Sequence, residues 1–157
     1  MLKRTIVLGA VAAILLLAAI QLAPYGRDHY NPPVTGEPAW KGAQTRALTV
    51  RACFDCHSNE TVWPWYSNVA PVSWLVQRDV QEGRDELNFS QWDAGQEGDH
   101  AAETVTDGSM PPRIYLLTHP AARLSDAERQ VLAQGLAETL GDYLGEGDKD
   151  KGKERDR

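Results

Sequence analysis

The two cysteines of the chain, Cys53 and Cys56, are separated by two residues and followed directly by His57. This C-x-x-C-H spacing suits covalent attachment of haem: each thiol forms a thioether with a vinyl group, and the adjacent imidazole faces the iron. We therefore expect one haem c per chain, attached by Cys53 and Cys56, with His57 as the proximal iron ligand.

Two other chemistries use a C-x-x-C pair. A structural zinc site normally has four nitrogen or sulfur ligands, but the chain has no second cysteine pair, and His57 is too close to Cys56 to join the same chelate easily. A thioredoxin-like dithiol is expected in βαβ surroundings, whereas the apolar pattern here is helical. A plain disulfide is the remaining alternative. Haem is favoured because His57 follows the pair at once and because the N-terminus predicts export.

The sixth iron ligand is predicted to be Met110, the only methionine besides Met1. A thioether is a soft, uncharged ligand that raises the reduction potential relative to a second histidine. Two prolines follow Met110 and would fix the backbone after it. Met110 could instead fill a gap in the core, and an open sixth position is a further alternative. The competing ligands are the remaining histidines: first His119, then His100 and His29.

Groups around the haem follow from its chemistry. The Nδ1–H of His57 needs an acceptor that fixes the ring, and we expect a backbone carbonyl of residues 68–70. Haem propionates need hydrogen-bond donors. The candidates are Trp63, Trp65, Tyr66, Arg78 and Arg113.

The N-terminus predicts a membrane anchor over residues 1–23. Lys3 and Arg4 precede an apolar run from Thr5 to Ala23, which is about 19 residues and at roughly 1.5 Å each approaches the ~30 Å hydrocarbon core. The basic residues favour a cytoplasmic N-terminus. The rival interpretation is a cleaved signal peptide, although Pro24 follows directly. Either way we expect the rest on the exported, periplasmic side, in the anchored case of a single-pass protein of the cytoplasmic membrane.

Beyond the anchor we expect a Pro- and Gly-rich linker over residues 24–38, a haem-binding domain over 39–144 and a charged, disordered tail over 145–157. Within the domain, apolar residues at spacings of three and four predict helices. The expected helices cover residues 39–52, 71–82, 99–106 and 125–143, the last opened by a Ser125–Glu128 capping box and ended by Gly145. Since nothing in the chain resembles a strand, the expected fold is all-α and cytochrome c-like.

The chain has a net charge of −6; Lys3 and Arg4 contribute +2 and the tail from residue 145 is balanced, so residues 5–144 carry −8. An acidic body is a poor nucleic-acid binder, since phosphate contacts require Lys and Arg. Residues 79–107 are especially acidic and form either a solvated face or a docking surface for a basic partner; their spacing matches no calcium loop.

Several segments of the chain form a recognisable pattern. They are residues 53–61, Trp63-Pro64-Trp65-Tyr66, Ala70-Pro71-Val72-Ser73-Trp74, Leu87-Asn88-Phe89-Ser90, Met110-Pro111-Pro112 and the segment from Tyr115 through His119-Pro120 to Ser125. With them the chain resembles the small bacterial haem-binding domain family over residues 47–140. The resemblance implies a single covalent haem c, in a domain that occurs alone or beside cytochrome c and di-haem peroxidase modules. A looser similarity to class I cytochromes c supports Met110.

These features together favour a membrane-anchored, exported mono-haem protein that passes single electrons to a redox partner. No arrangement of acid–base or nucleophilic groups indicates catalysis, so we do not expect an enzyme. The first alternative is a haem sensor in which a small ligand displaces Met110. The second is an accessory haem domain of a peroxidase system.

Overall fold

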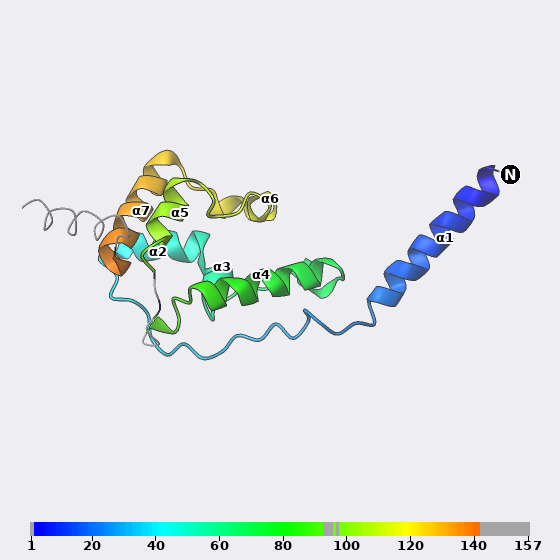
Figure 1. Cartoon of the computed structure of the whole chain (residues 1–157), viewed down its shortest axis with the longest axis horizontal. Coiled ribbons are helices and arrows are strands. Elements are labelled where there is room, and N and C mark those ends of the chain that lie inside the picture. The colour runs from blue at the N-terminus through cyan, green and yellow to red at the C-terminus, as the bar shows by residue number, and fades with distance from the viewer. Residues whose placement is uncertain (1, 93–95, 97, 142–157) are drawn as a thin grey trace, which may run out of the picture.

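The computed structural model describes residues 2–92, 96 and 98–141 (Figure 1). Within these residues every regular element is a helix, which confirms the predicted all-α fold; the one β-like feature is an isolated bridge between Gly36 and Gln91. The predicted tail, residues 145–157, lies outside the described residues. The elements are α1 (Leu2–Ile20), α2 (Ala43–Ala52), α3 (Phe54–His57), η1 (Trp65–Asn68), α4 (Val72–Glu86), α5 (Ala101–Thr106), α6 (Tyr115–Thr118), η3 (Pro120–Ala122) and α7 (Asp126–Leu140).

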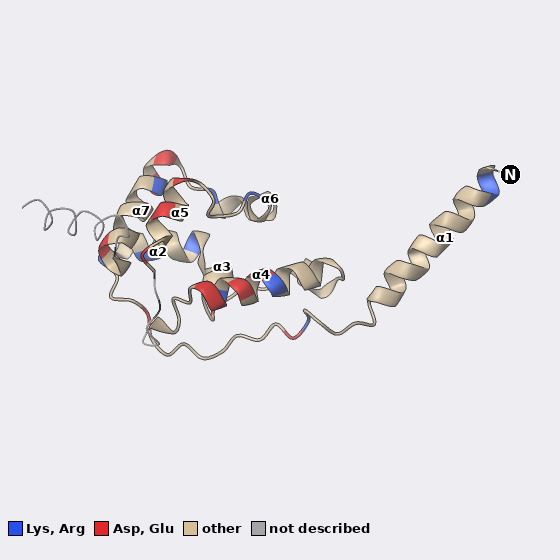
Figure 2. Cartoon of the chain, in the orientation of Figure 1, with Lys and Arg blue, Asp and Glu red and all other residues tan. Residues whose placement is uncertain are grey.

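Helix α1 extends away from the other helices, and none of its residues is buried (Figure 1). Its charged side chains lie at its first turn and the rest is uncharged (Figure 2). In the described part of the chain it is the one helix long and apolar enough to cross a membrane, and a signal sequence would satisfy the same criteria.

Residues 24–38 are extended and are hydrogen-bonded to the helical domain. Thr35 donates its backbone N–H to the carbonyl of Ser90 (2.9 Å), and Arg84 of α4 donates to the carbonyl of Tyr30 (3.0 Å). The Asn31 side chain donates to the carbonyl of Thr61 (3.0 Å). The segment that the sequence marks as a linker therefore runs along the helical domain and is hydrogen-bonded to it.

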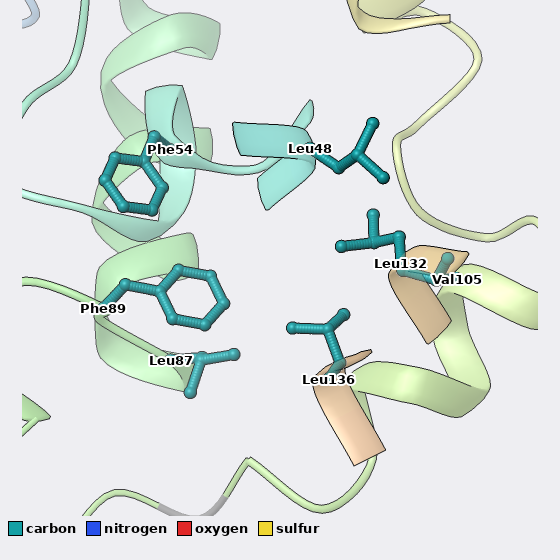
Figure 3. Packing of buried hydrophobic residues seen from close by; sticks show 7 residues of the cluster. All are labelled: Leu48, Phe54, Leu87, Phe89, Val105, Leu132 and Leu136. Atoms are coloured by element: carbon teal, nitrogen blue, oxygen red, sulfur yellow. The ribbon is translucent and has the colours of Figure 1, made fainter. Parts of the chain in front are cut away.

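The core is formed where α2, α5 and α7 meet the loop after α4. Phe54 of α3 stacks on Phe89 with ring centroids 5.8 Å apart. Phe54 lies directly after the first cysteine, so this packing fixes the C-x-x-C-H turn to the core. Figure 3 shows the buried cluster, which consists of Leu48, Phe54, Leu87, Phe89, Val105, Leu132 and Leu136.

The four helices expected in the domain are all present, with shifted ends. Helix α2 ends at Ala52 as predicted but begins at Ala43, four residues later than expected, and α4 runs four residues beyond residue 82. The capping box at the start of α7 is formed by Ser125 and Glu128 as predicted. Helix α7 ends at Leu140 rather than near residue 145, because Gly141 adopts a positive φ of 101° that a helix cannot continue through.

Candidate functional site

The C-x-x-C-H motif forms a single helical turn between α2 and α4. The backbone N–H groups of Cys56 and His57 both donate to the carbonyl of Cys53, at 3.2 and 2.9 Å. Residues three and four apart are neighbours on a helix surface. The turn therefore places Cys53 next to both Cys56 and His57, so two thiols and an imidazole are available to a single haem.

His57 is held by the chain segment that follows α4. Its Nδ1 lies 3.0 Å from the carbonyl oxygen of Leu87, and the N–H of Phe89 donates to the carbonyl of His57 at 2.8 Å. Because a carbonyl only accepts, Nδ1 carries the proton and Nε2 keeps a lone pair for a metal. Burial lowers the pKa of His57, which favours the neutral imidazole that iron binds.

The prediction that residues 68–70 supply the acceptor for His57 is wrong. The carbonyl of Ala70 instead accepts the side-chain amide of Gln21 at 2.8 Å. The acceptor for His57 is the carbonyl of Leu87. Helix α4 is longer than predicted, and Leu87 directly follows its C-terminal end, where the carbonyl contacts the imidazole.

Gly83 allows α4 to approach the motif this closely. A methyl group at this position would lie 2.7 Å from the carbonyl oxygen of Cys56 and 3.0 Å from the carbonyl carbon and Cβ of the same residue. These are backbone and near-backbone atoms, so a side chain here would push α4 away from α3 and carry Leu87 away from His57.

Replacing Gly83 with alanine is expected to destabilise the domain by about 1–3 kcal/mol, the usual cost of overpacking. The measurement is chemical denaturation of the haem-free chain, which separates stability from cofactor loading. The matched control is Gly42→Ala, because a methyl group there would meet only the Thr45 hydroxyl, at 3.8 Å. An equally stable Gly83→Ala variant would contradict the close approach.

The two thiols have surroundings unlike those of a redox dithiol. They form no disulfide, and burial raises the pKa of Cys53 to about 12 and that of Cys56 to about 11. Reactive dithiols have lowered thiol pKa values instead. Among the described residues no three His, Cys, Asp or Glu side chains are placed to hold a metal ion.

Exposed apolar side chains lie on two helical segments of the domain. Val72 at the start of α4 is 42% exposed, and Ile114 and Leu117, directly before and within α6, are 63% and 70% exposed. An apolar porphyrin needs apolar walls, and these side chains are candidates for them. The donor set at the motif, two thiols and a neutral imidazole, fits a haem.

A separate pocket beside α3 does not match this site. It measures about 230 Å³ and none of the predicted haem-site residues lines it. Its lining residues are Arg46, Val50, Phe54, Asp55, Glu60 and Val62.

Met110 lies in the loop after α5, and its backbone is fixed by its neighbours. Its N–H donates to the carbonyl of Thr104 (2.9 Å), and Arg129 of α7 donates to the carbonyls of Val105 (2.7 Å) and Met110 (3.5 Å). The side chain is half-buried. The loop thus has a defined position on the α5–α7 pair, and ligation by Met110 stays a prediction.

The competing histidines all have protein partners. His119 stacks on Tyr115 with ring centroids 3.9 Å apart, and its Nδ1 lies 3.0 Å from the carbonyl of Tyr115. His29 stacks on Trp63 at 4.8 Å. The exposed His100 lies 3.4 Å from a carboxylate oxygen of Glu103. His119 also lies near the motif, with its Nε2 4.0 Å from a carboxylate oxygen of Asp55. The choice of Met110 over the histidines stays a prediction.

Sequence reasoning missed a contact that ties α6 to the motif. Tyr115 donates its hydroxyl to the carboxylate of Asp55 at 2.6 Å, between the two cysteines. Burial and this hydrogen bond raise the pKa of Tyr115, which keeps the hydroxyl protonated as a donor. The two residues are far apart in the chain, so no spacing pattern could have revealed the pair. The contact holds α6 against the motif.

Several candidate propionate donors already have protein acceptors. The Trp63 indole N–H donates to Asn31 (3.2 Å), the Tyr66 hydroxyl to Thr118 (3.0 Å) and the Arg78 guanidinium to Asp79 (3.0 Å). The two remaining candidates have exposed side chains: Trp65 and Arg113.

A comparison with protein families matches the chain over residues 15–138 to the family described as the haem-binding domain. The matched region starts within α1 and includes residues 24–38. It therefore begins well before residue 47, the first residue of the resemblance described in the sequence analysis. Comparisons with curated proteins and with solved structures found no match. Since the match covers most of the chain and includes the C-x-x-C-H turn, the chain belongs to the haem-binding domain family and binds haem.

Proposed function

We propose that the chain carries one covalently attached haem c and transfers single electrons. The observation that carries this proposal is the geometry of the motif turn. Cys53, Cys56 and His57 lie within this one turn, and the Leu87 carbonyl holds Nδ1 of His57 so that Nε2 is left for iron. Haem c supplies a one-electron Fe(III)/Fe(II) couple when bound.

The role proposed for the chain is to hold the cofactor rigidly. Cys53 and Cys56 would fix the porphyrin by thioethers, His57 would bind one axial position and Met110 the other. Rigid ligation by two side chains favours electron transfer over substrate binding. The proposal includes no enzymatic activity.

The proposed location is the exported face of the cytoplasmic membrane, with α1 retained as a single-pass anchor. Its length, composition and basic first turn support this proposal. The redox partner is proposed to be a protein with a basic docking face. Acidic residues lie on the C-terminal half of α4, the helix that contacts Cys56, and are the red segments of that helix in Figure 2.

The test is performed on protein purified from cells that attach haem c. The intact mass is expected to exceed that of the full chain by one haem, and potentiometric titration is expected to follow a one-electron curve. A mass without haem would overturn covalent attachment, and a mass without residues 1–23 would overturn the retained anchor. Rapid binding of carbon monoxide by the reduced protein would favour the sensor over the electron carrier.

A further inference from the structure

The end of α1 is clamped to the loop before α4. Gln21, the first residue after the helix, donates its amide to the carbonyl of Ala70 (2.8 Å) and accepts the Ala70 N–H on its Oε1 (3.0 Å). Ala70 is only 2% exposed, so this reciprocal pair is shielded from water. Arg27 donates to the same Oε1 at 3.0 Å and steadies the amide.

Further contacts hold the residues that follow. Gly26 has a φ of 81° and passes so close to the carbonyl of Ser73 that any side chain would collide with it. Tyr25 donates its hydroxyl to Gln81 of α4 at 3.0 Å. The residues that follow α1 thus contact α4 and the loop before it at once, without a flexible spacer. The orientation of α1 therefore constrains the orientation of the domain.

Apolar side chains are exposed at this junction. Leu22 is 85% exposed, Trp65 79% and Val69 45%. Val69 is adjacent to the clamped Ala70, and the N-terminal end of α4 is the part of the domain nearest the end of α1 (Figure 1). We call these three residues the junction edge. Single exposed apolar residues are ordinary, but these adjoin a helix of membrane length.

We propose that the junction edge lies in the lipid–water interface, so that the domain is docked on the bilayer and not merely tethered to it. The proposal rests on the membrane anchoring proposed above. A helix that spans the bilayer ends at the interface, where tryptophan is enriched because its ring is apolar and its N–H is polar. The hydrogen bonds between Gln21 and Ala70 hold Val69, and η1 with Trp65 just before it, next to the end of α1.

The family match includes the junction. It begins at residue 15, inside α1, and extends to residue 138. The last turn of the helix and the extended segment therefore lie inside the region that the family model matches.

The test uses the full haem-loaded chain in nanodiscs of phosphatidylcholine and phosphatidylglycerol. Trp65 is replaced by the photoreactive residue benzoylphenylalanine, and the matched control carries it at Val131 on α7, which is 38% exposed. After irradiation, intact mass reports lipid adducts. Adducts are expected at position 65 and absent at position 131. In a Gln21→Leu background, which removes both bonds to Ala70, most of the adducts at position 65 are expected to be lost.

The outcomes separate the inference from the proposal on which it rests. A chain that does not co-purify with nanodiscs, or lacks residues 1–23, overturns membrane anchoring and the docking with it. A chain that co-purifies but gives no lipid adduct at position 65 overturns docking alone, as do adducts to a second copy of the chain or to the haem. Adducts undiminished by Gln21→Leu, in a variant with an unchanged haem spectrum, would overturn the role of the clamp.

Discussion

A chain in which Cys53 and Cys56 are both replaced by serine is expected to carry no haem after denaturation. Serine preserves the size and burial of each side chain, but its hydroxyl oxygen does not replace the thiolate sulfur in forming thioethers. Each single variant is expected to keep haem through the remaining thioether. The measurement is haem staining of a denaturing gel together with the intact mass.

The matched control for this prediction is Glu60→Gln, an exposed change just after the motif. It should retain the full haem load. Haem that stays bound to the double-serine chain through denaturation would show attachment elsewhere and would overturn the c-type site. Haem that binds the double variant only before denaturation would leave His57 as a ligand and limit the cysteines to covalent retention.

The motif and its helical surroundings could be predicted because they depend on local spacing. Both cysteines and the imidazole lie within one turn, and the Ser125–Glu128 capping box marked the start of α7 correctly. The end of α7 could not be predicted, because Gly141 and Gly145 are equally good helix terminators in the sequence.

The groups that position His57 and α6 could not be predicted, since they come from tertiary packing. The acceptor for His57 depends on where α4 ends and on Gly83, whose missing side chain admits the backbone of Cys56. The bond between Tyr115 and Asp55 joins distant segments. The extended segment before α2 is another case: its prolines indicate a linker, whereas its bonds to Ser90 and Arg84 attach it to the domain.

Replacing Met110 with alanine is expected to remove the sixth iron ligand. The weak red absorption band of ferric haem with Met–His ligation should disappear, and the reduced protein should bind carbon monoxide. The reduction potential should fall by a fraction of the ~0.8 V range over which axial ligands set haem potentials, because a thioether stabilises the reduced iron. Absorption spectra and potentiometric titration measure these effects.

The control for Met110→Ala is His119→Ala, which tests the strongest competing ligand. His119 stacks on Tyr115 and receives no role at the iron in this interpretation, so its loss should leave the red band and the potential close to wild type. The reverse pattern, with a silent Met110→Ala and a His119→Ala variant that binds carbon monoxide, would assign the distal position to His119. That outcome would require α6 to turn His119 away from Tyr115, and the Tyr115–Asp55 bond would then be the contact to break first. Two silent variants would indicate an open sixth position, which is the coordination that a haem sensor requires.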